Sequence, residues 1–118
     1  MRDDIKYIAR INKYCHEVLA FVEGYDFEQF LDDLKTNRAS AATVEQIGET
    51  AKKIGIDLKS GYNHIPWRKI MGIRDVIARD YEGINWETVW QVIKGNIPEL
   101  LTYTQEILND INQQEENQ

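Results

Sequence analysis

The sequence predicts an all-α domain, a bundle of four to five helices. Hydrophobic residues recur at helical spacing along nearly the whole chain, no segment alternates convincingly enough to compete as a strand, and there are only two prolines and seven glycines. With 118 residues, the chain is long enough to bury roughly two-thirds of its unfolded surface without disulfides or metal. We therefore expect one domain over residues 1–111, followed by a polar tail over residues 112–118 that frays.

The first two helices are expected before the middle of the chain. The first should span about residues 3–23, where apolar residues repeat every three or four positions. The sequence Gly24-Tyr25-Asp26 ends this helix and offers Asp26 as the N-cap of a short second helix, with Gln29 in the capping-box position. A break is then expected over residues 37–40.

The third helix is expected to begin at about Ala41. Gly48 and Ala51 lie on its apolar face, and their small side chains allow the backbone of a neighbouring helix to approach closely. Between them, Glu49 either faces Arg74 of the basic motif described below or is an ordinary solvated surface residue.

The fourth helix is expected to carry that motif. It follows a loop over residues 61–64 and begins near Pro66, because the first helical turn does not need the N–H that proline lacks. Gly83 ends it. Asn85 then offers an N-cap for a further amphipathic segment, and residues 95–98 kink or restart the chain before the last helix.

Charge is distributed unevenly along the chain. The net charge is -6, yet residues 52–79 contain seven basic side chains against two acidic ones, a local charge of +5 that leaves -11 for the rest. Such asymmetry can focus an anionic ligand on one region while the remainder repels it. The alternative is a solvated face of mixed charge.

Within this basic region, Arg74 and Tyr81 stand at a spacing that is compatible with a site. At about 100° per residue, they lie within about 20° of each other on one helical face, whereas Arg79 lies about 140° from Arg74. The two arginines can meet on one ligand only if the helix ends or distorts nearby, or if a second copy of the chain contributes. The alternative is an inert arginine paired with a neighbouring carboxylate, beside a tyrosine whose hydroxyl is in water.

The motif resembles the signature of the HepT-like proteins of the HEPN superfamily. That signature consists of an arginine, a polar residue, three residues, a histidine, one residue and a tyrosine. Arg74, Asp75 and Tyr81 fit it, and Arg79 occupies the position of the histidine. The resemblance extends in order and spacing along most of the chain, through Phe30-Leu31, Ile47-Gly48-Glu49, Ile65-Pro66-Trp67-Arg68, Trp90 and Pro98.

What the resemblance implies is a homodimer whose two motif helices meet at a cleft, and a ribonuclease toxin that cuts RNA without metal beside a minimal nucleotidyltransferase antitoxin. Arg74 would bind phosphate, and Asp75 would orient the side chain of Arg74. The nucleotidyltransferase would modify Tyr81 with AMP. A guanidinium suits the first role because it stays charged and offers a planar fork to phosphate oxygens. Other residues expected at or near the cleft are Glu49, Arg68 and His64.

Arg79 puts the catalytic step in question. Imidazole takes and gives a proton near neutral pH, whereas the pKa of arginine lies far above that range. General acid–base catalysis contributes about 10²- to 10⁴-fold, so its loss alone can silence an enzyme that still binds its substrate. Either the chain has degenerated naturally, or a native histidine was replaced by design or selection; the intact remainder of the motif favours the second. Of the two histidines, His16 is expected at the edge of the core or on the surface, and His64 could approach the cleft from its loop.

Other classes of function stay open: a non-catalytic helical adaptor that binds a nucleotidyltransferase, and a dimeric scaffold whose basic region meets no RNA. The three tryptophans are expected to pack in the core or an interface rather than stack on bases. The sequence contains no Cys/His cluster with metal-ligand spacing and no glycine-rich phosphate loop, so no cofactor is expected. A single cysteine, no signal peptide and no membrane-spanning apolar run lead us to expect a cytoplasmic protein without membrane contact.

Overall fold

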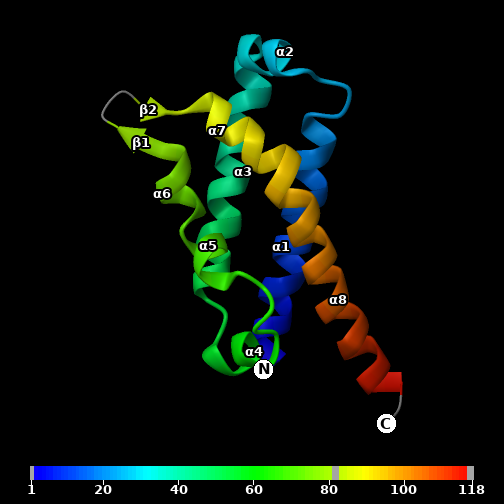
Figure 1. The fold of residues 1–118 in the computed structure, drawn as a ribbon. Helices are drawn as coiled ribbons and strands as arrows, with labels where there is room; N and C mark the ends of the chain where they lie inside the picture. The colour runs from blue at the N-terminus through cyan, green and yellow to red at the C-terminus, as the bar shows by residue number, and fades with distance from the viewer. Residues whose placement is uncertain (1, 81–82, 117–118) are drawn as a thin grey trace.

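Three long helices form the body of the molecule. The computed structural model describes residues 2–80 and 83–116, including their side chains except those of residues 2 and 78–80. Helix α1 (Arg2–Phe21) packs against both α3 (Leu34–Lys52) and α8 (Ile97–Glu116), as Figure 1 shows. The predicted all-α bundle is therefore confirmed.

Shorter helices complete the first two-thirds of the chain. Helix α2 (Phe27–Asp32) precedes α3, and α4 (Ile56–Gly61) follows it. Two single-turn helices, α5 (Trp67–Met71) and α6 (Ile73–Ile77), then run back along α3 and pack on it. Figure 1 shows them alongside α3, and a groove separates them from α8.

A small β-hairpin, which was not predicted from the sequence, follows α6. Its strands β1 (Ala78–Asp80) and β2 (Gly83–Ile84) pair antiparallel with an irregular register and project from the bundle (Figure 1). Helix α7 (Trp86–Gln91) and a π-helical turn, η1 (Val92–Asn96), then lead into α8 without leaving helical geometry. The expected kink or restart at residues 95–98 is thus a π-helical turn within one helical path.

Both helix caps that the sequence predicted are formed. The side chain of Asp26 accepts a hydrogen bond from the N–H of Gln29 at 2.8 Å, and the side chain of Gln29 accepts one from the N–H of Asp26 at 3.0 Å. At the start of α7, Asn85 accepts a hydrogen bond from the N–H of Thr88 at 3.0 Å. These contacts pair N–H groups that have no partner within their own helices.

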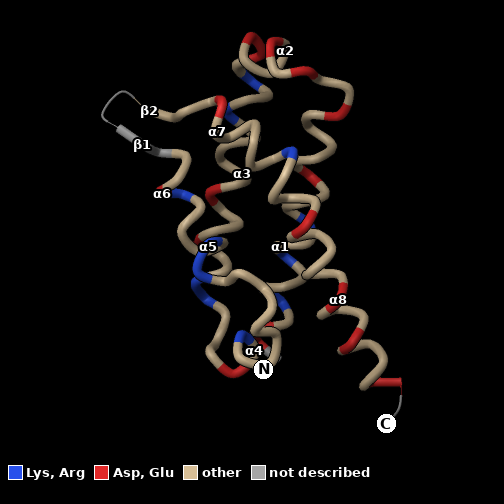
Figure 2. Tube along the Cα trace, viewed as in Figure 1, with Lys and Arg blue, Asp and Glu red and all other residues tan. Residues whose placement is uncertain are grey.

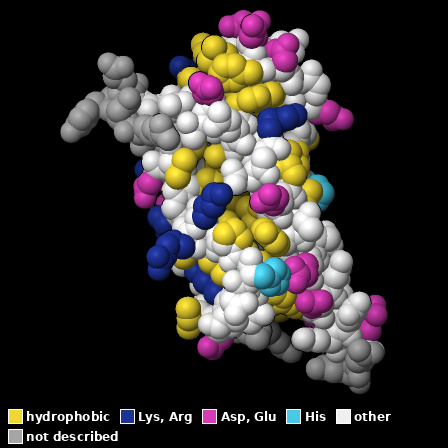
Figure 3. Space-filling view, in the orientation of Figure 1, with side chains coloured by type: hydrophobic (Ala, Val, Ile, Leu, Met, Phe, Trp, Pro, Cys, Tyr) yellow, Lys and Arg dark blue, Asp and Glu magenta, His cyan; other side chains and the backbone are white. Residues whose placement is uncertain are grey.

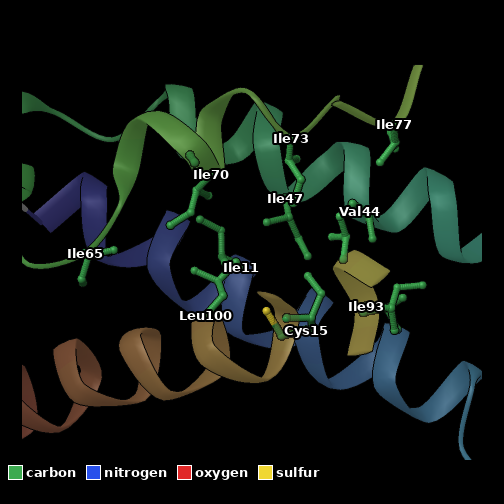
Figure 4. Close-up of a cluster of buried hydrophobic side chains, with 14 of the residues drawn as sticks. Ile11, Cys15, Val44, Ile47, Ile65, Ile70, Ile73, Ile77, Ile93 and Leu100 are labelled. Atoms are coloured by element: carbon green, nitrogen blue, oxygen red, sulfur yellow. The ribbon is translucent and has the colours of Figure 1, made fainter. Parts of the chain in front are cut away.

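Branched aliphatic side chains fill the core between the long helices (Figure 4). Cys15 lies among them, and burial raises the pKa of its thiol to about 12, so this thiol is unreactive at neutral pH. The fully buried aliphatic side chains of the core include Ile8, Ile11, Val18, Val44, Ile47, Ile77, Val89, Ile93, Ile97 and Ile107.

Aromatic side chains close one end of the bundle. Phe30 of α2 is fully buried, and its ring centroid lies 5.1 Å from that of Trp90 and 6.2 Å from that of Trp86, both on α7. Trp67 is also buried, and its indole N–H donates to the backbone oxygen of Tyr62 at 3.1 Å. Trp67 therefore packs in the core, and the half-buried Trp86 and Trp90 pack against it, as expected.

The break expected over residues 37–40 is wrong, because these residues lie within α3. The break lies at Asp33, which ends α2 and caps α3 by accepting a hydrogen bond from the N–H of Thr36. Asn37 is fully buried, and its side chain donates to the backbone oxygens of Phe30 and Leu31 at 3.1 and 3.2 Å. Asparagine usually favours the ends of helices. Here Asn37 lies inside α3, and its side chain links α3 to α2.

The continuous fourth helix is also wrong. Gly72 separates α5 from α6, and α6 ends at Ile77, six residues before Gly83. Glycine disfavours a helix interior by about 1 kcal/mol relative to alanine. After Ile77, pairing within the hairpin replaces continuation of the helix. The N–H of Asn85 donates a hydrogen bond to the backbone oxygen of Ile77 at 3.0 Å.

At the C-terminal end, α8 continues through Glu116, five residues into the segment expected to fray. Residues 117–118 lie outside the described part. Among the described residues, no helix has both the length and the apolar character needed to cross a membrane.

Candidate functional site

Helices α5 and α6 reach α3 at one small residue, Gly48. A Cβ atom added to Gly48 would lie 2.8 Å from Cγ2 of Ile73 and 3.3 Å from the backbone oxygen of Ile70. The close approach predicted at Gly48 is therefore confirmed, and the elements that approach are those that carry the arginine motif. As a result, the first turn of α6 lies directly against the part of α3 that contains Glu49.

Arg74 lies beside Glu49 at this junction. Nη1 of Arg74 is 3.8 Å from Oε1 of Glu49, and Nζ of Lys52 donates to the same oxygen at 3.1 Å. The hydrogen bond and charge of Lys52, followed by the charges of Arg74 and Lys53, hold the pKa of Glu49 below its usual value. The side chain of Arg74 is 58% exposed, so most of its N–H donors can reach a ligand from solvent.

Asp75 and Arg68 are both exposed on the two motif helices. The backbone N–H of Asp75 donates to the oxygen of Gly72 at 3.1 Å, which fixes the start of α6. No described carboxylate lies within ion-pair distance of Arg68. Its guanidinium is therefore also accessible to an anion.

The remaining motif residues follow α6 in the sequence. Arg79 lies in β1 with its side chain outside the described part, and Tyr81 lies outside the described residues altogether. Because α6 ends at Ile77, the angles expected from one helix through Arg74, Arg79 and Tyr81 do not apply. A helix that ends close to Arg79 is one of the conditions under which Arg74 and Arg79 can reach one ligand.

His64 is held by α8. Its Nε2 lies 3.0 Å from Oε1 of Glu106, and its ring stands edge-on to that of Tyr103 at a centroid distance of 6.0 Å. The neighbouring Tyr62 donates to Asp110 at 2.8 Å; burial and this hydrogen bond raise the pKa of Tyr62 to about 12. These contacts attach the loop before α5 to α8. None of them involves Arg74.

Basic side chains gather on the side of the molecule formed by α5 and α6. Figure 2 shows lysines and arginines along these helices and acidic residues over α2 and α8, and Figure 3 shows the same separation on the surface. The basic stretch of the sequence therefore lies on one side of the molecule, and an anion is attracted to this α5–α6 side.

Lys52 is the closest partner of Glu49, and this contact was not predicted from the sequence. The spacing of three residues on one helix was a usable signal, because such residues are neighbours on a helical surface. Within residues 2–80 and 83–116, no three His, Cys, Asp or Glu side chains are arranged to hold a metal ion.

Fold and site together define a small helical protein with an exposed, basic surface site suited to a phosphate group. The family model described as "Ribonuclease HepT-like" matches residues 7–107, most of the chain. The chain therefore belongs to the HepT-like ribonuclease family, and the resemblance inferred from the motif is confirmed.

Similar proteins agree with this assignment. A candidate RNase of Methanocaldococcus jannaschii is 32% identical over 116 residues, which cover 98% of this chain and 96% of that protein. A candidate RNase of Caldanaerobacter subterraneus subsp. tengcongensis is 32% identical over 108 residues, 92% of this chain and 96% of that protein. A probable ribonuclease HepT of Thermococcus cleftensis is 34% identical over 94 residues, 80% of this chain and 86% of that protein. No solved structure matches this chain significantly.

Proposed function

We propose that this chain is the ribonuclease toxin of a toxin–antitoxin pair, with a metal-independent endoribonuclease site at the cleft of a homodimer in the cytoplasm. The family supplies the class of activity, and the similar proteins are named as ribonucleases. The observation that carries the proposal is Arg74, a guanidinium that is 58% exposed on a helix packed firmly against α3. Such a group can bind a phosphate without first leaving a buried ion pair.

Cleavage at this site needs phosphate binding and proton transfer. Arg74 binds the non-bridging phosphate oxygens and stabilises the charge that grows on them, and Asp75 orients Arg74 from the same helix. A base must remove the proton of the ribose 2′-hydroxyl as its oxygen attacks phosphorus, and an acid must protonate the departing 5′-oxygen. Imidazole at position 79 could do either; Arg79 stays protonated and can only bind.

A second copy of the chain is proposed to pack beside Arg74. Val76 of α6 is a large hydrophobic residue that is 43% exposed, at the edge of an apolar groove between α5–α6 and α8. Lys69 and Glu99 also line this groove. A two-fold axis beside this groove would place Lys69 and Glu99 of both copies at the interface and bring the two sets of motif residues together.

Tyr81 is proposed as the residue that a nucleotidyltransferase antitoxin modifies with AMP. It follows Arg79 by two positions, after the short strand β1. The added nucleotide would bring bulk and a negative charge to the region of the proposed cleft, and both would exclude an RNA phosphate. The proposal rests on the match of Tyr81 to the family motif.

The first experiment restores the histidine. Arg79→His and the chain itself are incubated with end-labelled RNA in a chelator. We expect Arg79→His to cleave at least about 10²-fold faster, the lower end of what general acid–base catalysis contributes. Adding Arg74→Ala should abolish this cleavage, whereas adding Arg38→Ala, another exposed arginine, should not.

The alternative is a non-catalytic adaptor that binds a nucleotidyltransferase, a function that Arg79 specifically favours. If Arg79→His folds and forms the same oligomer but cuts no RNA, the ribonuclease proposal fails and binding of the nucleotidyltransferase takes its place.

A further inference from the structure

A second cluster of positive charge lies outside the family motif, around the ring of Tyr7 on α1. Nζ of Lys6 is 5.1 Å from the ring centroid, the guanidinium carbon of Arg10 is 5.6 Å from it, and Nζ of Lys53 is 5.8 Å from it. Lys53 comes from the end of α3, so the cluster joins two helices. The three cationic residues are exposed and Tyr7 is half-buried.

The charges of this cluster are not neutralised locally. Among the described carboxylates, none lies within ion-pair distance of Lys6, Arg10 or Lys53. Asp4, the nearby acid of α1, instead accepts a hydrogen bond from the backbone N–H of Gly55 at 3.1 Å. Cation–π attraction offsets part of the mutual repulsion of the three cations, and an external anion would offset the rest.

Lys53 connects the cluster with the candidate active site through the C-terminal end of α3. Lys53 follows Glu49 by one helical turn, a rise of about 6 Å. Glu49 in turn contacts Arg74, and the charge of Lys53 contributes to the lowered pKa of Glu49. Positive groups therefore continue from Arg74 through Lys52 to the ring of Tyr7.

We propose that Lys6, Arg10 and Lys53 form a phosphate-binding site for the single-stranded RNA that flanks the bond cut at Arg74, with Tyr7 holding the three cations together. The inference rests on the proposed ribonuclease function. A groove of positive charge that includes an aromatic ring is a common means of holding single-stranded RNA without regard to its sequence. The cluster thus extends the substrate contact to several phosphates along one strand.

The test uses the chain with its own Arg79, so that binding is measured without cleavage. Fluorescence anisotropy of a labelled single-stranded RNA compares the chain with a triple variant, Lys6→Gln, Arg10→Gln and Lys53→Gln. We expect binding to weaken at least about ten-fold at 0.1 M salt. The slope of log affinity against log salt should fall by about 2, since each phosphate contact on a single strand contributes about 0.7.

A matched control removes the same charge elsewhere. Lys35→Gln, Arg38→Gln and Lys94→Gln together change three exposed residues at other places on the surface, and affinity should stay within about two-fold. Tyr7→Phe keeps the ring and should bind normally, while Tyr7→Leu should bind several-fold more weakly. Thermal unfolding of each variant checks that the fold is kept.

The outcomes separate this inference from the proposed function. If both triple variants weaken binding equally, only the overall charge matters and the inference is overturned. It is also overturned if Arg79→His cuts RNA and the cluster variant in that background cuts with unchanged KM. If Arg79→His cuts nothing while the cluster variant still loses RNA binding, the phosphate site stands and the ribonuclease function fails.

Discussion

At the scale of single residues, Glu49 governs how freely Arg74 can act. The carboxylate lies closer to Lys52 than to Arg74, 3.1 against 3.8 Å, and both cations are half exposed. An exposed pair at the longer distance is weak, so the proposed RNA phosphate could replace Glu49 as the partner of Arg74 at little cost. Glu49 would still accept the hydrogen bond from Lys52 after losing its contact with Arg74.

The pKa of Glu49 reports this arrangement. Because that pKa is lowered, the carboxylate stays ionised throughout the neutral range, and its contacts are lost only as pH falls through the lowered pKa. We expect Lys52→Ala to raise the pKa of Glu49 more than Arg74→Ala does, since Lys52 is the largest cause of the shift. NMR titration of the Glu49 carboxyl carbon measures both, with Lys94→Ala as a control that should leave it unchanged. A larger effect from Arg74→Ala would show that the ion pair with Arg74 dominates.

In the proposed mechanism, the side chain at position 79 separates binding from turnover. Arg74 and Arg79 both offer guanidinium groups, and neither can exchange a proton near neutral pH. Under this proposal, phosphate affinity and catalysis depend on different members of one short motif. An arginine at position 79 would then preserve positive charge at the site without supplying general acid–base catalysis.

At the scale of elements, the contact of α3 with α5 and α6 positions the site, and Gly48 permits that contact. We expect Gly48→Ala to destabilise the protein by about 1–3 kcal/mol, because the new methyl group would meet Ile73 at 2.8 Å and backbone oxygen at 3.3 Å. Chemical denaturation measures the free energy of unfolding. The matched control is Gly95→Ala: no atom lies within 4 Å of its added Cβ, so stability should stay equal or rise. Equal stability of Gly48→Ala and the native chain would mean that the helices move apart without loss.

The elements that sequence predicted well are those whose signals are local. The capping box of Asp26 and Gln29 and the cap at Asn85 involve partners three residues away, and all of these contacts form. Gly48 was also readable, because a small residue on an apolar helical face permits close packing. Helix caps and close contacts could therefore be predicted from short stretches of sequence.

Tertiary partners decided the elements that sequence predicted wrongly. Asn37 is of a residue type that often ends helices. In the structure it is buried within α3, and its side-chain amide donates to two backbone oxygens of α2. The motif helix has a continuous helical pattern, yet it ends at Ile77 where the hairpin begins. Of the candidate site, the contact of Arg74 with Glu49 could be anticipated, whereas the attachment of His64 to Glu106 depends on where α8 packs.

At the scale of the whole molecule, charge is separated between two sides. The basic side contains α5, α6 and the end of α3, and the acidic side contains α2 and α8 (Figure 2). A net charge of -6 repels a polyanion in general, whereas the basic side attracts one. For the proposed ribonuclease, this polarity would restrict the orientations in which RNA approaches and favour those that bring phosphates to Arg74.

The proposed homodimer can be tested on the same scale through Val76, which is 43% exposed beside Arg74. We expect Val76→Glu to convert the dimer into a monomer of 13.8 kDa, because the substitution places like charges together at a two-fold interface and opposes burial of the apolar groove. Sedimentation velocity measures the mass. In the Arg79→His background, the same change should abolish RNA cleavage, since the cleft needs both copies.

The control for this experiment is Ile56→Glu, a change at another exposed large hydrophobic residue, 73% exposed on α4. The Ile56→Glu variant has the same net charge as the Val76→Glu variant. A difference between the two therefore depends on the position of the added charge. We expect Ile56→Glu to remain dimeric and active, because α4 lies outside the proposed interface. If Val76→Glu sediments as the native chain does and keeps full cleavage in the Arg79→His background, α6 does not form the dimer interface, and each copy of the chain must contain a complete site.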